Sequence, residues 1–333
     1  MRIERRDFLA GSACLLGAGC AQSQSGRADG VVAMVDAFDE LCIDRDGRAI
    51  ATNPMLQAMN EVLVCASDFS SSEIWSHPRS DMRPCNISLS ASGRLLLFCL
   101  EPLRPAPVRL CVLDRHTGRL TEIVTGFPYV SAPSFDEASD RVFFFARPLN
   151  EESFRPYVTP VSGGAVTRVA DERFVDCTQS RYGDGVLYCN GTRATGIFDS
   201  GAVDIRTNYR RLNIIGDRGD DLDARLTAMA PTYGSINLAD IYDDGDVLVS
   251  TVHLTTFVRH LVKMGREPQT LELPPEGKFV RAVLAGATGE IAFSILEPGT
   301  GDLDDSKVLY FRGMSAYLRD IAKKGARRTM ELG

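Results

Sequence analysis

The sequence predicts an all-β protein, a six-bladed β-propeller of four-stranded antiparallel blades with a short C-terminal helix. Two observations predict this fold. Short β-rich segments recur along the chain at a period of roughly 45 residues, and most periods leave room for two further strands. The chain has 333 residues, of which 44% are hydrophobic and 24% charged, which is enough to bury the core of one large β domain.

The recurring unit is a β-rich segment, a polar turn that contains Gly or Asp, and an apolar run. Copies lie at residues 41–53, 87–99, 132–146, 177–190, 237–251 and 280–295. Their turns are marked by Gly47, Gly93, Ser139, Asp184, Gly245 and Gly289, so successive markers are 46, 46, 45, 61 and 44 residues apart. Strand-turn-strand content at this period is typical of propeller blades.

The remainder of most periods contains two more candidate strands. After the second copy, residues 108–113 and 120–124 are apolar and flank the polar turn at 114–118. The same offsets give strand pairs at residues 62–66 with 74–76, 156–161 with 166–169, and 260–264 with 270–273. Four strands in each of six repeats is the resulting prediction.

The two ends of the repeat array predict how the ring closes. The sixth period has strand candidates at residues 291–295 and 307–311, but residues 314–328 carry apolar side chains at helical spacing. An apolar strand candidate, residues 30–35, precedes the first full repeat. We expect this strand to complete the last blade, because closure removes two free sheet edges. The propeller is therefore expected over residues 30–313, and a helical tail over 314–333.

Three segments resemble the repeat of TolB-type propellers. The sequences ISLSASGRLLLF (87–98) and APSFDEASDRVFFFA (132–146) resemble a repeat with Ser-Pro-Asp-Gly followed by a strand that ends in Phe, and LCVLDRHTGRLTEIVTG (110–126) resembles its second hairpin. The resemblance spans about residues 40 to 311 and implies a six-bladed propeller. No copy keeps the full Ser-Pro-Asp-Gly, and the separate N-terminal α/β domain of TolB is not expected here. A role in the Tol system therefore does not carry over.

The first nineteen residues have the pattern of an export signal, and residues 20–29 that of a linker. The apolar stretch at residues 10–19 is roughly half the ~20 residues of a membrane span, and basic residues precede it. Arg5 and Arg6, followed by Asp-Phe-Leu, resemble the twin-arginine signal, which exports folded proteins. The alternative is an ordinary secretory signal that contains an arginine pair.

Residues 15–20 (LLGAGC) resemble a lipoprotein box, in which Cys20 would become the lipidated N-terminus. Gly17 stands where lipoproteins prefer Leu, and cleavage after residues 19–21 would instead release a soluble protein. The expected location is the periplasm, either free or as a membrane-anchored lipoprotein that faces the periplasm.

Composition and residue spacing argue against several classes of partner. The net charge of −7 and the absence of a basic cluster disfavour nucleic acid. No Cys-x-x-Cys or Cys/His spacing indicates a zinc site, so neither a metal nor a cofactor is expected. The acidic stretch at residues 217–223 lacks the spacing of a calcium loop. We interpret it as a solvated loop or a cap over the channel mouth.

Two cysteine pairs lie equidistant from a turn. Cys177 and Cys189 flank residue 183, and Cys99 and Cys111 flank residue 105. Equidistant residues of a regular hairpin stand opposite each other with Cα atoms about 4.5 to 5.5 Å apart, which a disulfide can bridge. The first pair is favoured because its turn is short and polar. The alternative is buried thiols that pack as small apolar groups.

Propellers bind ligands around the central channel, where the innermost strands begin, and in the loops of that face. The residues that the repeat places near those points are Tyr129, Ser131, Asp176, Thr178, Arg181, Asn237, Asp240 and Arg281. The alternative is that these polar residues only solvate the channel and hydrogen-bond neighbouring blades.

The sequence leaves two functions open. The first is a cell-envelope binding or scaffolding module that recognises a protein or peptide through its channel face, with no catalytic residues. The second is an envelope enzyme that acts on a sugar polymer, as in propellers of the oligogalacturonate lyase kind. A serine hydrolase is disfavoured because the sequence has no Gly-x-Ser-x-Gly motif.

Overall fold

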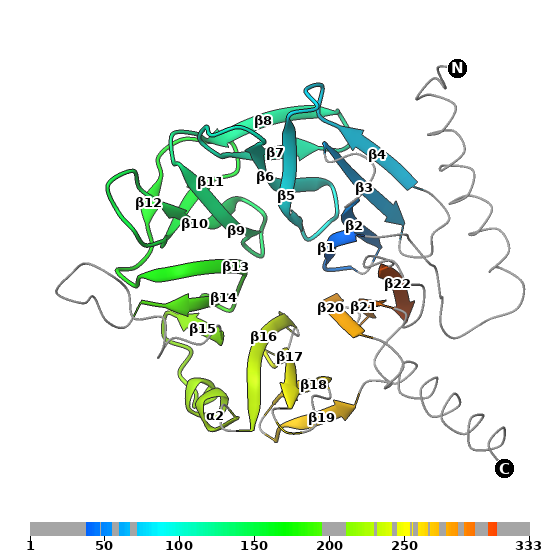
Figure 1. Ribbon diagram of the computed structural model, residues 1–333, viewed down its shortest axis with the longest axis vertical. Helices are drawn as coiled ribbons and strands as arrows, with labels where there is room; N and C mark the ends of the chain where they lie inside the picture. Colours follow the sequence, from blue (N-terminus) through cyan, green and yellow to red (C-terminus); the bar gives the residue numbers. More distant parts are fainter. Residues whose placement is uncertain are drawn as a thin grey trace, which may run out of the picture.

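A computed structural model describes residues 38–46, 48–54, 60–66, 72–194, 211–229, 232–241, 245–253, 255, 259–265, 267–272, 278–285, 290–296 and 306–311. Apart from helix α2 (Leu222–Met229), the elements in these residues are β-strands (Figure 1). The signal segment, the expected closing strand at residues 30–35 and the expected helix at 314–328 lie outside the described residues.

The strands form sheets in which neighbours along the chain are neighbours in space. The first sheet contains β1 (Phe38–Ile43), β2 (Ala49–Pro54), β3 (Glu61–Ala66) and β4 (Ser72–Ser76). The second contains β5 (Met82–Leu89), β6 (Leu95–Pro102), β7 (Arg109–Asp114) and β8 (Arg119–Val124). The third contains β9 (Tyr129–Phe135), β10 (Arg141–Arg147), β11 (Arg155–Pro160) and β12 (Thr167–Arg168).

The second half of the chain is less regular. A seven-stranded sheet contains β13 (Phe174–Gly183), β14 (Val186–Arg193), β15 (Arg211–Ile215), β16 (Tyr233–Ile241), β17 (Val247–His253), β18 (Arg259–Met264) and β19 (Gln269–Glu272). The last sheet contains three described strands, β20 (Lys278–Ala285), β21 (Glu290–Leu296) and β22 (Ser306–Phe311). Pairing is antiparallel except between β15 and β16, which are joined in parallel at Arg211 and Ile236.

The first strands of successive groups surround a common centre. Strand β1 contacts β5, β5 contacts β9, β9 contacts β13, β13 contacts β16, β16 contacts β20, and β20 contacts β1. Figure 1 shows these strands nearest the middle of the molecule, with the later strands of each group farther out. The first and last described sheets therefore lie side by side.

The core lies between neighbouring sheets, and this explains the apolar runs of the sequence. Along β6, Leu96 and Phe98 pack with the first sheet, whereas Leu97 and Cys99 pack with the third. Successive side chains of a strand point to opposite faces. Because both faces of such a strand are buried, the strand reads as a continuous hydrophobic run and not as an alternating one. The VFFFA run of β10 has the same cause.

The polar turns that mark the repeat are built alike. Asp136 accepts hydrogen bonds at Oδ1 from the backbone N–H groups of Asp140 (2.8 Å) and Arg141 (3.1 Å), and Asp44 makes the equivalent pair. Ser90 accepts one from Leu95 N–H at 2.9 Å. These side chains cap the turn between the first and second strand of a sheet, which explains the recurring Asp or Ser.

Four of the predicted turn markers adopt the left-handed backbone conformation. The φ angles are 70° at Gly93, 60° at Ser139, 52° at Asp184 and 81° at Gly245. Ser139 and Asp184 adopt this conformation with a side chain, but at Gly93 a Cβ atom would lie 2.8 Å from Asp44 Oδ2, so the close approach favours glycine there. The turn assignments at these four positions are confirmed, and Gly47 and Gly289 lie outside the described residues.

The fourth period departs from the repeat because a helix follows its third strand. The acidic stretch begins α2: Asp220 Oδ1 accepts a hydrogen bond from Leu222 N–H at 3.1 Å, while Arg218 Nε donates to Asp220 Oδ2 at 2.8 Å. Leu222 and Leu226 are buried in a cluster with residues of β14 to β18. Asp217, Asp220 and Asp221 precede the helix and are exposed, as the solvated-loop interpretation expects, whereas Leu222 and Asp223 belong to α2. The carboxylate of Asp220 caps this helix.

Candidate functional site

The innermost strands share one irregularity, a β-bulge part-way along their length. The pairing register shifts between Cys85 and Ser88 in β5, between Ser131 and Ser134 in β9, and between Cys177 and Gln179 in β13. Equivalent shifts occur in β1, β16 and β20. A bulge bends the strand locally and turns a side chain in a new direction.

The bulges of the second, third and fourth groups follow the sequence period. Asn86, Ala132 and Thr178 are 46 residues apart, and Asn86 and Ala132 have φ angles of 53° and 48°. Positive φ is uncommon for residues other than glycine and is found where surrounding contacts hold the backbone.

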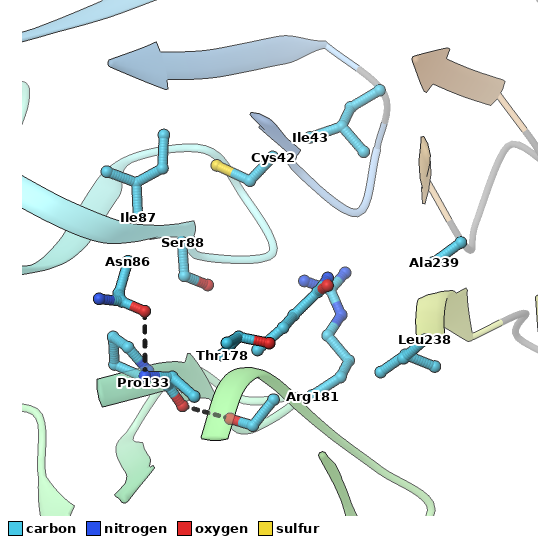
Figure 2. A pocket seen from close by; sticks show the side chains of 13 residues that line it. Cys42, Ile43, Asn86, Ile87, Ser88, Pro133, Thr178, Arg181, Leu238 and Ala239 are labelled. Atoms are coloured by element: carbon cyan, nitrogen blue, oxygen red, sulfur yellow. Dashed lines mark hydrogen bonds between the residues drawn. The ribbon is translucent and has the colours of Figure 1, made fainter. Parts of the chain in front are cut away.

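A pocket open to solvent lies at these bulges and is lined by residues of β1, β5, β9, β13 and β16 (Figure 2). Its cavity volume is about 30 Å³, which accommodates one or two water-sized groups. Its lining consists of Cys42, Ile43, Asn86, Ile87, Ser88, Ala132, Pro133, Thr178, Gln179, Ser180, Arg181, Leu238 and Ala239. Figure 2 shows the Arg181 side chain extending into the pocket.

Polar groups of the pocket also fasten neighbouring inner strands together. Asn86 Oδ1 accepts a hydrogen bond from Ala132 N–H at 3.3 Å. Ser180 Oγ donates to Ala132 O at 2.5 Å and lies 2.9 Å from Ser134 Oγ. The side chains of Asn86, Ser134 and Ser180 therefore hydrogen-bond neighbouring sheets, as expected of polar residues around the channel.

The inner strands offer backbone groups as well as side chains. Strands β5, β9 and β13 each pair on one side only, with β6, β10 and β14. The other edge faces the centre, and an edge strand presents N–H and C=O groups outside any ladder. Such an edge can hydrogen-bond an extended peptide, and a guanidinium such as that of Arg181 can bind a carboxylate.

Two of the predicted site residues, Thr178 and Arg181, line the pocket. Thr178 is the bulge residue of β13, and its hydroxyl donates to Asn190 O at 3.4 Å. Asn237, Asp240 and Arg281 lie on inner strands, opposite Ser250, Leu248 and Ser294 respectively. Asn237 does not line the pocket, and the side chains of Asp240 and Arg281 are outside the part of the chain that the structure describes.

The remaining three predicted residues lie outside the pocket lining. Tyr129 begins β9, is 48% exposed, and has the Arg147 guanidinium 3.8 Å from its ring centre. Asp176 Oδ1 accepts a hydrogen bond from Thr192 N–H at 2.8 Å. Ser131 Oγ is buried and has no hydrogen-bond partner among the described residues.

Four polar residues of the pocket were not predicted from the sequence: Asn86, Ser88, Gln179 and Ser180. Tyr129, Ser131 and Asp176 lie near the starts of their strands, whereas the pocket lies at the bulges. The repeat itself carried a usable signal, since Asn86 has the same offset as the predicted residue Thr178 two periods later.

The cysteine geometry corrects one prediction. Cys99 pairs with Leu110 and Cys111 with Phe98, so the two side chains lie on opposite faces of the sheet and a Cys99–Cys111 disulfide is wrong. Cys111 packs with the first sheet, and burial raises the pKa of its thiol to about 12.

Cys177 and Cys189 do lie close together, although not opposite each other. The bulge places Cys177 opposite Gly191 and Cys189 opposite Ser180, while the two buried thiols are within hydrogen-bonding distance. Burial, with the neighbouring thiol, raises the pKa of Cys177 above its ordinary value. The disulfide between Cys177 and Cys189 stays a prediction.

Within the part of the chain that the structure describes, no cluster of His, Cys, Asp or Glu has the geometry to hold a metal ion. No helix in that part is long and apolar enough to cross a membrane.

Solved structures with a similar arrangement share little sequence with this chain. A luciferin-regenerating enzyme superposes with a TM-score of 0.51 at 9% identity, over 86% of this chain and 95% of that protein. The β-propeller domain of the Trilobed protease from Pyrococcus furiosus gives 0.48 at 10% identity, over 81% and 80%.

TolB from Acinetobacter baumannii gives a TM-score of 0.45 at 13% identity, over 83% of this chain and 63% of TolB. No protein-family model matches the sequence, and no curated protein matches it. The fold is that of a β-propeller. At these identities the likeness establishes the fold alone.

Proposed function

We propose that the chain is an exported, six-bladed propeller that binds a protein or peptide of the cell envelope through its central channel. The blade count is supported by six inner strands, each of which contacts the next around the centre. This count treats the seven-stranded sheet as two blades, β13–β15 and β16–β19, which are joined only by the parallel pair of Arg211 and Ile236. The expected closing strand, residues 30–35, would then extend the three-stranded last sheet beyond β22.

The observation that carries the binding role is the pocket at the bulges. It combines the inward-facing edges of β5, β9 and β13 with the Arg181 guanidinium and the Thr178 hydroxyl. These are groups that recognise the backbone and the carboxylates of an extended peptide. The described residues that line the pocket include no Asp, Glu or His to act as general acid or base, so these groups suit a peptide ligand better than the alternative, an enzyme that acts on a sugar polymer.

A peptide selection tests the binding role. The mature chain is used to enrich ligands from a random peptide library, and an enriched peptide is titrated against variants. Arg181→Ala should weaken its binding about tenfold or more, because arginine at the centre of an interface contributes strongly. Arg119→Ala is the matched control: Arg119 is exposed on β8, the outermost strand of its sheet, and should bind unchanged. Equal affinity of both variants, or cleavage of polygalacturonate by the mature chain, would count against the proposal.

The export step makes a separate prediction. We propose that Arg5 and Arg6 are read by the twin-arginine exporter and that Cys20 is lipidated. Changing both arginines to Lys should abolish export of a fused reporter, and Cys20→Ala should move the protein from the membrane to the soluble fraction. Full export of the Lys-Lys variant would point to an ordinary secretory signal. An unchanged fraction for Cys20→Ala would reject the lipid anchor.

A further inference from the structure

The second sheet contains a cysteine pair that stands directly across two strands. Cys85 in β5 is the register partner of Cys99 in β6. Both side chains belong to the buried cluster between the second and third sheets, so they lie on the same face. Partners in an antiparallel pair have Cα atoms about 4.5 to 5.5 Å apart, within the span of a disulfide.

Comparison with the neighbouring repeats shows that the fold does not itself require this pair. One and two periods later, the position of Cys85 is occupied by Ser131 and Cys177. Their cross-strand partners are Phe145 and Gly191. The same pairing position therefore accepts side chains of very different size, and only in the second of these three sheets are both partners cysteine.

We propose that Cys85 and Cys99 form a disulfide by exchange with a disulfide-carrying oxidant. The Cys85 thiolate attacks the oxidant's disulfide, which forms a mixed disulfide and releases one oxidant thiol. The Cys99 thiolate then attacks the Cys85 sulfur, so that the Cys85–Cys99 bond forms and the second oxidant thiol leaves. The two protein thiols lose two protons and two electrons, and the oxidant's disulfide is reduced to two thiols.

The burial of the groups gives the order of these steps. Cys85 is 8% exposed and Cys99 is 0% exposed, so Cys85 meets the oxidant first and Cys99 resolves the intermediate. Cys111 does not compete for Cys99, because it lies on the opposite face of the sheet.

The disulfide would hold β5 to β6 immediately before the bulge that lines the pocket. Asn86 follows Cys85 directly, lines the pocket and accepts the hydrogen bond from Ala132 N–H. A cross-link here ties the inner strand to β6 next to that bulge. We expect the oxidised protein to unfold at a temperature a few degrees higher than the reduced protein.

Trypsin separates the three cysteines of the sheet, because it cuts after arginine but not before proline. Cys85 falls in residues 80–94, Cys99 in 95–109 and Cys111 in 110–115. The purified mature chain is incubated with oxidised glutathione, denatured, alkylated and digested without reduction. The expected product is peptide 80–94 linked to peptide 95–109. The same digest reports on Cys177 and Cys189, in residues 174–181 and 182–193.

Matched variants keep the outcome decisive. Cys111→Ser should retain the cross-link and the shift in unfolding temperature, whereas Cys85→Ser and Cys99→Ser should lose both. Serine at position 85 is a mild change, because Ser131 occupies the equivalent position one period later. Recovery of peptides 80–94 and 95–109 as alkylated thiols, or a link between 95–109 and 110–115, would overturn the inference. Since the oxidation uses purified protein, the result for the disulfide does not depend on whether the export and peptide-binding proposals are correct.

Discussion

Replacing Phe144 by alanine should lower the free energy of unfolding by about 3 to 5 kcal/mol. The Phe144 side chain is fully buried between the second and third sheets. Its ring centre lies 6.3 Å from that of Phe127 and 5.7 Å from that of Tyr157. Truncation removes these contacts and leaves a cavity that the rigid strands on both sides cannot close.

Urea unfolding of the mature chain measures this effect. The single tryptophan, Trp75, packs against Phe98 with ring centres 4.9 Å apart and serves as the fluorescence probe. Leu149→Ala is the control, because Leu149 is 82% exposed and its loss should change the free energy by no more than about 0.5 kcal/mol. Similar unfolding midpoints for the two variants would contradict the burial of Phe144 in an inter-sheet core.

The repeat could be predicted from the sequence because the same physical demands recur in each period. Strands buried on both faces must be continuously apolar, and their connecting turn needs a capping Asp or Ser and a residue that tolerates positive φ. The predicted hairpins at residues 108–113 with 120–124 and 260–264 with 270–273 are confirmed within a residue or two.

Helix α2 was missed for an identifiable reason. Leu222, Leu226 and Met229 have helical spacing, and the first two are buried. The preceding acidic residues suggested metal binding or solvation, although an Asp before an apolar run is also the signature of a helix N-terminus.

The site was harder to predict because it depends on single-residue shifts of register. A bulge adds one residue to one strand, and nothing in the spacing of Cys177 and Cys189 from their turn reveals it. The regular-hairpin assumption therefore placed these cysteines opposite each other and also paired Cys99 with Cys111. The ligand site was expected at the strand starts because propellers bind ligands there, whereas Thr178 and Arg181 line a pocket at the bulge of β13.

A second large effect is expected at Asn190, which joins the two halves of the seven-stranded sheet. Asn190 lies in β14, is 2% exposed, and hydrogen-bonds both backbone groups of Leu238 in β16. Its Nδ2 donates to Leu238 O at 3.2 Å, and its Oδ1 accepts from Leu238 N–H at 2.5 Å. Nδ2 also donates to Gln179 Oε1 at 3.2 Å. One side chain thus supplies the hydrogen bonds that a neighbouring strand would otherwise provide.

Asn190→Ala should therefore destabilise the protein by about 2 to 4 kcal/mol, because a buried backbone N–H and C=O of Leu238 each lose their partner. Because the variant loses the hydrogen bonds to Leu238, the backbone amides of β16 should exchange hydrogen faster than in the parent. Asn60→Ala is the matched control: Asn60 makes one partly buried hydrogen bond, from Nδ2 to His77 O at 2.8 Å, and its loss should cost about 1 kcal/mol. Urea unfolding and hydrogen exchange measure the two effects. If Asn190→Ala lowered the free energy of unfolding no more than Asn60→Ala, and the amide exchange of β16 were unchanged, the contact between β13–β15 and β16–β19 would not depend on the Asn190 hydrogen bonds.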